Sequence, residues 1–139
     1  MDYQQIKNFR NEKSSFAAKL GIVVEEVRQG YARAVKTIQN DDTNPLGRAH
    51  GASLFAIADT ACGSAAASYG FQSVTLNANY NFISGASAGD CITAEARETK
   101  HGKTISVYDV TLIDQNEKLI GTATMTFYNL GLPLPLDRE

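Results

Sequence analysis

The sequence is poor in cysteine and has no long apolar run, and both absences narrow the possible classes of protein. Cys62 and Cys91 are its two cysteines; they lie in different predicted elements, lack CxxC spacing and have no nearby histidine that could complete a metal site. We interpret them as buried, reduced thiols of a cytoplasmic protein. No stretch approaches the ~20 apolar residues of a membrane span. The charged first residues enclose no apolar run, unlike a secretory signal.

A concentration of positive charge is absent as well. Lys and Arg total 13 against 15 Asp and Glu, the formal net charge is -2, and the basic residues are scattered along the chain. Nucleic-acid surfaces are usually basic patches or stripes, so nucleic acid is not an expected partner. A length of 139 residues suits one hydrophobic core, and we predict a single domain over residues 1–139.

Hydrophobic spacing predicts the first elements. Apolar residues recur at near-helical spacing over residues 1–20 and stop at Gly21, which predicts one N-terminal amphipathic helix. Two runs rich in β-branched residues, 22–28 and 31–38, flank Gln29-Gly30 and predict a hairpin. Residues 50–69 lack proline and are dominated by alanine, so we expect a long helix that is buried on most sides.

After Gly70 the period of the sequence changes to that of a strand. Apolar and polar residues alternate from Val74 to Phe82, and further strands are expected at about 91–99, 104–114 and 118–129. The tail, 130–139, contains Pro133 and Pro135 and is not expected to continue a central strand. This order of elements predicts an α+β fold in which an antiparallel sheet wraps around the long central helix.

Asp59 stands out because it interrupts the most apolar helix. An ionised carboxylate there is costly unless a partner, water or ligand meets it. Its helix face carries Ala56 and Gly63 one turn away on either side, which leaves open space for a substrate. The structural alternative is a buried acid that hydrogen-bonds a backbone group or an arginine. Chemistry alone does not decide between these interpretations.

The start of the same helix offers a second chemical feature. Helix N-termini present unpaired N–H groups and partial positive charge, and Gly51 has no side chain to keep a carbonyl oxygen away. Gly51 therefore is a candidate oxyanion hole, or simply steric relief at the helix start. Eight residues of helix separate Gly51 from Asp59 by ~12 Å, so one carbonyl cannot touch both. Two antiparallel copies of the helix about a two-fold axis would pair them, which predicts a homodimer with composite sites.

The motifs resemble those of a known family. The runs are Asn44-x-x-Gly47-x-x-His50-Gly51, then Ala58-Asp59-Thr60-Ala61, then Ser84-Gly85-Ala86-x-x-Gly89-Asp90. Together they resemble the hotdog-fold acyl-CoA thioesterases of the phenylacetate-pathway type, over roughly residues 21–128. The resemblance implies hydrolysis of an acyl-CoA without metal or organic cofactor, coenzyme A being part of the substrate. Dimers of this kind can pair further into a homotetramer.

The resemblance also implies roles for single residues. Asp59 would be the nucleophile or general base, and the Gly51 amide would polarise the thioester carbonyl. Asn44 would orient the attacking water or the thioester. His50 would position the carbonyl or fix the helix end, and a purely structural hydrogen bond is an equal alternative. Gly47, Thr60 and Gly63 belong to the expected substrate-binding residues. The family commonly has a second glycine where this chain has Ala52, which leaves the details of the acyl pocket open.

The basic turn Lys100-His101-Gly102-Lys103 is a weaker candidate. Lys100, Gly102 and Lys103 could contact the phosphates of coenzyme A, whereas a solvated hairpin tip is the simpler interpretation.

Two other functions remain possible from the sequence. Asp42-Thr43-Asn44-Pro45-Leu46 resembles the start of the hotdog-type enoyl-CoA hydratase motif, but Gly47 stands where that motif has a histidine, so the expected base is missing. A non-catalytic acyl-CoA-binding protein is the alternative from another class, although Asp59 is an unusual choice for a site that only binds a neutral thioester. Hydrolysis of acyl-CoA is the function that the sequence favours.

Overall fold

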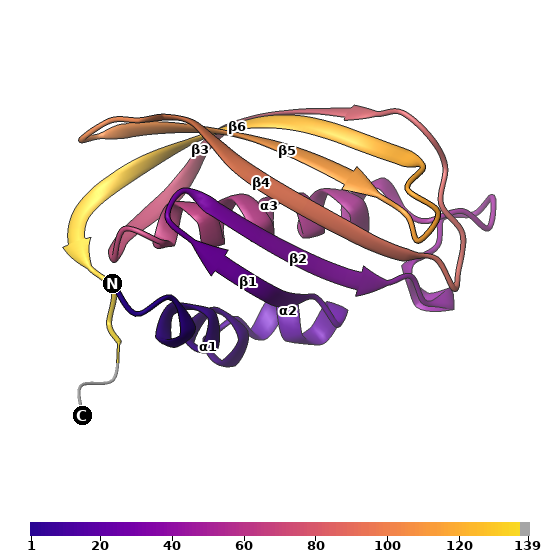
Figure 1. Ribbon diagram of the computed structural model, residues 1–139. Helices are drawn as coiled ribbons and strands as arrows, with labels where there is room; N and C mark the ends of the chain where they lie inside the picture. Colours follow the sequence, from indigo (N-terminus) through magenta and orange to yellow (C-terminus); the bar gives the residue numbers. More distant parts are fainter. Residues whose placement is uncertain (137–139) are drawn as a thin grey trace.

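The computed structural model describes residues 1–136, so the last residues of the predicted tail, 137–139, lie outside the described part of the chain (Figure 1). The helices and strands, in chain order, are α1 (Tyr3–Lys13), α2 (Ser15–Leu20), β1 (Val23–Arg28), β2 (Tyr31–Thr37), the 3₁₀ helix η1 (Asn40–Asp42), α3 (Gly51–Ala67), β3 (Phe71–Phe82), β4 (Cys91–His101), β5 (Ile105–Ile113) and β6 (Leu119–Pro133).

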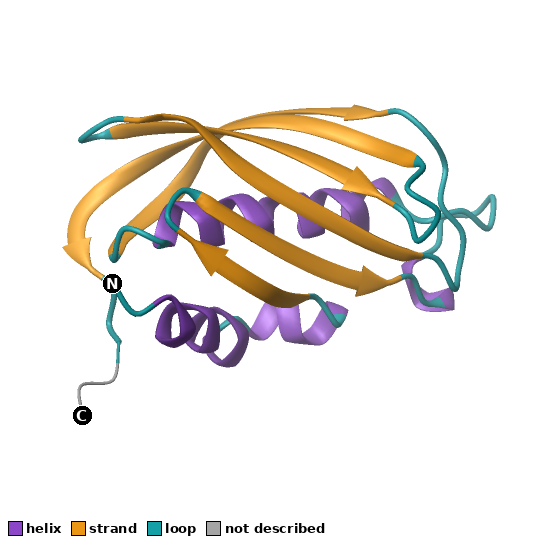
Figure 2. Ribbon diagram, in the orientation of Figure 1, coloured by secondary structure: helices purple, strands orange, loops and turns teal. Residues whose placement is uncertain are grey.

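The strands form one antiparallel sheet in the order β1-β2-β4-β5-β6-β3. Figure 2 shows that α3 runs along the inner face of this curved sheet, while α1 and α2 lie beside β1. The predicted α+β fold, an antiparallel sheet around a long central helix with helical structure at the N-terminus, is confirmed.

Helix α3 is the centre of the core, as its composition predicts. Its small side chains let the helix approach the sheet closely, and the buried apolar residues of α3 pack with those of the strands. One stripe is not fully buried. It contains Gly51, Ala52, Phe55, Asp59, Thr60 and Gly63. All functional expectations for this helix fall on that stripe.

The predicted single N-terminal helix is wrong in one respect, because Ser14 divides it. Ser14 adopts an extended conformation, and its hydroxyl accepts a hydrogen bond from the Ala17 N–H at 3.3 Å, which starts α2 as a new helix. The end at Gly21 is confirmed, since this residue takes a left-handed conformation with φ 70° that glycine adopts without steric cost.

The predicted end of the last strand is also wrong. Strand β6 continues past Asn129 to Pro133, which pairs with Phe71 of β3. The pairing of β6 with β5 begins at Tyr128, opposite Ile105, so the segment beyond has a strand on one side only. A proline without an N–H is tolerated at such an edge position.

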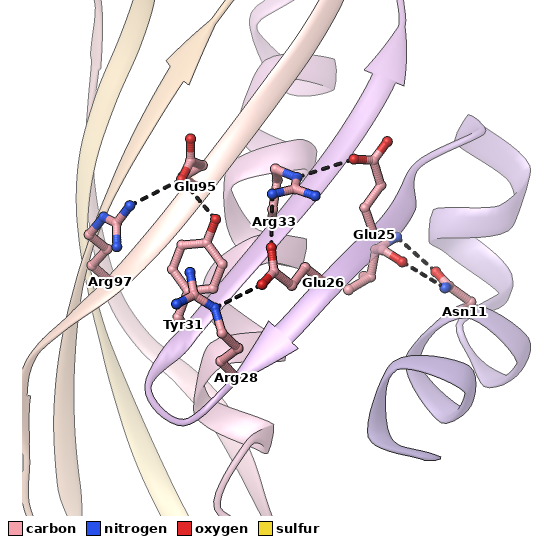
Figure 3. A network of polar contacts seen from close by, with 9 residues as sticks. Asn11, Glu25, Glu26, Arg28, Tyr31, Arg33, Glu95 and Arg97 are labelled. Atoms are coloured by element: carbon pink, nitrogen blue, oxygen red, sulfur yellow. Dashed lines mark hydrogen bonds and ion pairs between the residues drawn. The ribbon is translucent and has the colours of Figure 1, made fainter. Parts of the chain in front are cut away.

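The two edge strands of the sheet, β1 and β3, differ in what covers them. The edge at β1 is covered by α1: the Asn11 side-chain amide donates to the Val24 carbonyl at 2.9 Å, and its carbonyl oxygen accepts from the Val24 N–H at 2.8 Å (Figure 3). The edge at β3 carries exposed apolar side chains. Among them are Val74, Leu76 and Phe82.

Charged side chains near the β1 edge form a network across neighbouring strands. Arg33 of β2 contacts Glu25 at 3.1 Å and Glu26 at 2.9 Å, and Glu26 also contacts Arg28 at 2.8 Å (Figure 3). Arg28 lies over the ring of Tyr31, 4.0 Å from its centroid. This edge is therefore polar as well as covered.

A buried ion pair holds the loop that leads to α3. The Lys36 ammonium of β2 lies 2.8 Å from the Asp42 carboxylate of η1, with 2% and 8% of the two side chains exposed, and it also donates to the Leu20 carbonyl. Burial by itself raises the pKa of Asp42, but hydrogen bonds from Lys36 and the Gln39 N–H outweigh it, so this pKa lies below its ordinary value. The pair fixes where the chain turns toward the helix.

Candidate active site

The N-terminus of α3 is held by the residue before it. The His50 Nδ1 accepts a hydrogen bond from the Ala52 N–H at 3.0 Å, and the His50 N–H donates to the Asp42 carbonyl at 2.7 Å. Within residues 1–136 the Gly51 N–H has no hydrogen-bond acceptor. It remains available for a carbonyl oxygen, as an oxyanion hole requires.

His50 lies at this helix end rather than beside Asp59. Its side chain is exposed, and its Nδ1 is engaged as the helix cap. It does not line the cleft that contains Asp59. This position fits the structural role that the sequence left open for it.

Asp59 opens onto a cleft of about 530 Å³ on the uncovered stripe of α3. The cleft is lined by Phe16, Gly51, Ala52, Phe55, Ala56, Asp59, Thr60 and Phe82. Most of these side chains are apolar, and the carboxylate is the only ionisable group among them. Such a cleft suits an apolar ligand that presents one reactive polar group.

Thr75 of β3 is a partner of Asp59 that the sequence did not reveal. Its hydroxyl donates a hydrogen bond of 2.7 Å to Asp59 Oδ1. The alternating pattern assigned Thr75 to the polar face together with Asn77, but the pairing of β3 with β6 shifts between these two residues. A shift by one residue reverses the face to which side chains point, so Thr75 turns toward α3.

Asn44 and Gly47 shape the loop before α3. The Asn44 Oδ1 accepts from the Leu46 N–H at 2.9 Å and from the Arg48 N–H at 3.1 Å, and Gly47 has a left-handed φ of 77°. Asn44 lines a second cleft of about 390 Å³ that it shares with Gly51. The structure thus brings Asn44 to the helix start and not to the Asp59 cleft of the same chain.

Phe82 lines both clefts, as Gly51 does. A side chain at Gly51 would meet the Phe82 ring at 2.9 Å, so the glycine lets this aromatic ring lie directly against the start of the helix. Gly51 and Asp59 share a cleft, yet they remain two helical turns, ~12 Å, apart along α3. One carbonyl group cannot contact both residues of one chain.

The space beside Gly63 is filled, whereas the sequence predicted that it would be open. A Cβ at Gly63 would lie 2.8 Å from Nη2 of Arg10, a residue of α1. The Arg10 Nε donates to the Ser64 hydroxyl at 3.0 Å, and its Nη2 donates to the Thr60 carbonyl at 3.5 Å. The sequence gave no sign of this contact, since 54 residues separate Arg10 from Ser64.

The negative charge of Asp59 affects the pKa values of two neighbouring groups, Arg10 and Cys62. Burial lowers the pKa of Arg10, and the negative charge of Asp59 partly reverses that effect. The Thr60 hydroxyl donates to the Ala56 carbonyl at 2.7 Å, so it does not compete with Thr75 for the Asp59 carboxylate. Cys62 is fully buried, and burial raises the pKa of its thiol far above the ordinary range, with Asp59 adding to the effect.

The basic turn between β4 and β5 lies far from α3's start in the same chain. Lys100 and Lys103 are exposed, and the Gly102 N–H donates to the Ile105 carbonyl at 2.9 Å. In Figure 1 the turn is at the opposite end of the sheet from the loop that precedes α3. Contact with coenzyme A phosphates stays a prediction for these three residues.

Two classes of feature are not found among residues 1–136. No group of three or more His, Cys, Asp or Glu side chains is placed to hold a metal ion in this range. Over the same residues, no helix is both long and apolar enough to cross a membrane.

Known proteins share both sequence and fold with this chain. The model of the thioesterase superfamily matches residues 46–120. The acyl-coenzyme A thioesterase PaaI of Escherichia coli strain K12 is 32% identical over 120 residues, which make up 86% of each chain. The solved structure of E. coli PaaI, from the phenylacetic acid degradation operon, has a TM-score of 0.91 at 28% identity and covers 94% of this chain and 95% of its own.

A second solved relative was determined with a ligand. A hypothetical thioesterase of Streptococcus pneumoniae, in complex with coenzyme A, has a TM-score of 0.77 at 28% identity and covers 81% of this chain and 88% of its own. Two mutants of that protein, one with an aspartate and one with a threonine replaced by alanine, both have a TM-score of 0.75 at 27% identity and cover 78% of this chain and 90% and 89% of their own. Their substituted positions are 16 residues apart.

Proposed function

This chain belongs to the thioesterase superfamily and has the hotdog fold that its sequence predicts, and on that premise we propose that it hydrolyses an acyl-CoA thioester with Asp59 as nucleophile or general base. The observation that carries the proposal is the half-buried Asp59 carboxylate, held by Thr75 at 2.7 Å, in an apolar cleft that also contains the start of α3. Coenzyme A takes part as a portion of the substrate, and the proposal involves no metal or organic cofactor.

The reaction needs a base or nucleophile and a site for negative charge. In the general-base route the Asp59 carboxylate takes a proton from water, and the water oxygen bonds to the thioester carbon. The carbonyl oxygen becomes an oxyanion that the Gly51 N–H stabilises. The carbonyl then re-forms, the carbon–sulfur bond breaks, and the thiolate leaves and takes up a proton. In the nucleophilic route an Asp59 carboxylate oxygen bonds to the thioester carbon, the carbon–sulfur bond breaks and the coenzyme A thiolate leaves, and water then cleaves the resulting acyl anhydride into the acid product and free Asp59.

The distance between Gly51 and Asp59 makes a homodimer part of the proposal. With two α3 helices antiparallel about a two-fold axis, Gly51 and Asn44 of one copy approach Asp59 of the other. The exposed apolar side chains of the β3 edge support such an association, because an uncovered strand edge readily pairs with another chain. Pairing of two dimers into a tetramer, and contact of Lys100, Gly102 and Lys103 with coenzyme A phosphates, extend the same proposal.

Thr75 has a place in this mechanism. It is 16 residues after Asp59, which equals the separation of the aspartate and the threonine that were replaced in the S. pneumoniae thioesterase. A hydroxyl that donates to one carboxylate oxygen fixes the carboxylate and leaves its second oxygen free for water or the thioester. Thr75 is therefore a positioning residue.

The unbonded thiols Cys62 and Cys91 support a cytoplasmic setting, which we include in the proposal. Reducing compartments keep such thiols free, and they also contain the coenzyme A pool on which the reaction draws.

The decisive test is a thiol-release assay over short-chain, medium-chain and aryl-acetyl CoA substrates. Asp59→Asn should lower kcat by about 10²–10⁴-fold, the usual contribution of an acid or base group. Asp109→Asn is the matched control, because Asp109 also accepts a 2.7 Å bond from a threonine, Thr124, but lies on the exposed face of β5. Normal turnover by Asp59→Asn would remove Asp59 from the mechanism.

The same assay separates the other functions. Hydration of crotonyl-CoA without thiol release would indicate a hydratase, and tight acyl-CoA binding without any reaction would indicate a binding protein. A single turnover in ¹⁸O-labelled water tests the nucleophilic role of Asp59. Label in the Asp59 carboxylate would establish an anhydride that water cleaves at the aspartyl carbon, because the general-base route labels only the acid product.

A further inference from the structure

Arg10 is a half-buried cation for which the proposed hydrolysis has no use. It reaches from α1 to α3, where two of its nitrogens bond Ser64 and the Thr60 carbonyl. No carboxylate of residues 1–136 forms an ion pair with it, and its Nη1 has no acceptor in that range. A guanidinium stays protonated in proteins, so its charge remains partly desolvated and without direct compensation.

The guanidinium lines a cavity of its own. This cavity, about 240 Å³, is walled by α1, the end of α3, the start of β3 and the last part of β6. Its lining residues include Phe9, Arg10, Gly63, Phe71, Val74 and Leu130. Among residues 1–136, Arg10 is the only charged side chain that lines the cavity. A ligand with an apolar body and one negative end would match it.

The lining residues of the cavity and of the proposed catalytic cleft are neighbours along α3. Thr60 lines the Asp59 cleft and accepts a hydrogen bond from Arg10, while Gly63 lines the Arg10 cavity. Asp59 and Gly63 are four residues, or ~6 Å, apart along α3. An acyl chain whose carbonyl lies at Asp59 and which runs along the stripe toward the C-terminal end of α3 therefore arrives at Arg10.

We propose that Arg10 binds a carboxylate at the far end of the acyl group, so that the enzyme prefers acyl-CoA substrates with a terminal carboxylate to unsubstituted ones of equal length. This inference rests on the proposed thioesterase function and specifies its substrate class. The planar guanidinium offers paired N–H donors, and hydrogen bonds between two charged groups are about twice as strong as neutral ones. Burial strengthens the pairing because fewer water molecules compete for it.

A structural role alone would give a different result. If Arg10 only tied α1 to α3 through Ser64 and Thr60, its loss would lower stability and affect all substrates alike. A general effect changes kcat/KM for both substrates of a matched pair by the same factor, so their ratio is unaffected by it. The ratio therefore reports on contact between Arg10 and the end of the acyl group.

The test compares kcat/KM for succinyl-, glutaryl- and adipoyl-CoA with that for butanoyl-, pentanoyl- and hexanoyl-CoA. Wild-type enzyme should prefer one of the carboxylated substrates by about 10–100-fold over its partner of equal length, the range of one hydrogen bond between charged groups. Arg10→Met keeps the apolar stem and should abolish that preference. Lys13→Met, which removes an exposed charge from the same helix, is the matched control and should retain it.

Two further measurements keep the test independent of the folding of Arg10→Met. Gly63→Ala keeps the charge but places a methyl group 2.8 Å from Nη2, too close for the guanidinium to stay where it is, and it should also reduce the preference. Free adipate should inhibit wild-type enzyme more strongly than free hexanoate. Hydrolysis of both series at equal efficiency by the wild type, or an equal loss for both in Arg10→Met, would overturn the role of Arg10. Absence of hydrolysis for every acyl-CoA would instead refute the proposed function.

Discussion

The two edges of the sheet solve the same physical problem in opposite ways. An edge strand presents unpaired N–H and C=O groups that can pair with another chain. At β1, the Asn11 side chain bonds both backbone groups of Val24, and charged residues surround the strand. At β3, Leu76 is 60% exposed, and no strand among residues 1–136 pairs with the outer edge of β3. The first edge is closed to partners, and the second is suited to a copy of the same chain.

The two edge strands also lie next to different functional parts of the molecule. The closed edge belongs to the part that anchors α1 and the loop before α3, where the Lys36–Asp42 pair lies. The open edge belongs to the strand that supplies Thr75 to Asp59 and Phe82 to both clefts. Association through β3 would thus act on the site directly, whereas changes at β1 would act on stability.

The strongest test of the comparison places a lysine on each edge. Leu76→Lys puts a charge into the open edge and should convert the proposed homodimer to monomers, with turnover lower by about 10²-fold or more because the proposed composite site would be lost. Val23→Lys is the matched control, since Val23 is 49% exposed on the closed edge. Size-exclusion chromatography with light scattering and the thiol-release assay measure both effects. An active monomer of Leu76→Lys would contradict the composite site.

The next largest effect is expected at the buried ion pair. Asp42→Asn leaves the Lys36 ammonium without its counter-charge and should lower the free energy of unfolding by about 3 kcal/mol, as for other broken buried pairs. Glu26→Gln, in the exposed network at β1, should cost less than about 1 kcal/mol. Urea denaturation of both variants gives the comparison, and equal losses would show that burial does not distinguish the two pairs.

The same pair gives the protein a definite response to acid. The folded-state pKa of Asp42 lies below the unfolded value of about 3.9, so its ionised form stabilises the fold. This contribution is complete above the unfolded pKa and is lost as pH falls through the folded-state pKa. Between pH 5 and pH 3, wild type should lose more stability than Asp42→Asn. Parallel losses in this range would assign the acid sensitivity to other groups.

The smallest effect is expected where α1 closes the β1 edge. Asn11→Ala removes two hydrogen bonds and leaves the Val24 backbone groups to water, which should lower the free energy of unfolding by about 1–2 kcal/mol. Asn8→Ala, in the same helix, lacks a contact with β1 and serves as the control. Amide hydrogen exchange at Val24 should rise in the first variant alone, and unchanged exchange would mean that Asn11 does not protect this edge.

Local patterns predicted the elements well, but they failed wherever a distant strand or helix decided the outcome. The alanine-rich run around Asp59 predicted α3, because small side chains without proline permit a buried helix. Pro133 misled the prediction for β6, since the sequence does not reveal that β5 begins opposite Tyr128 and leaves Pro133 paired with β3 alone. Ser14 could have been identified as a helix cap, because serine is favoured there.

The same limit applies to the candidate site: residues within one helix could be predicted, and residues placed by contacts between distant elements could not. Asp59 and Gly51 stand out within a single helix, where spacing alone defines their relation. Thr75 requires a register shift in β3, and Arg10 requires the packing of α1 against α3; both depend on contacts between elements that lie apart in the sequence. Sequence periodicity does not contain such information.

The buried state of Cys62 has a consequence for an enzyme that releases coenzyme A. Its product carries a free sulfhydryl, which readily forms mixed disulfides with accessible cysteines when conditions become oxidising. Only the thiolate takes part in this exchange, and the fully buried Cys62 remains protonated three residues from Asp59. The protein thus handles a thiol product without offering a cysteine in α3 that this product could modify.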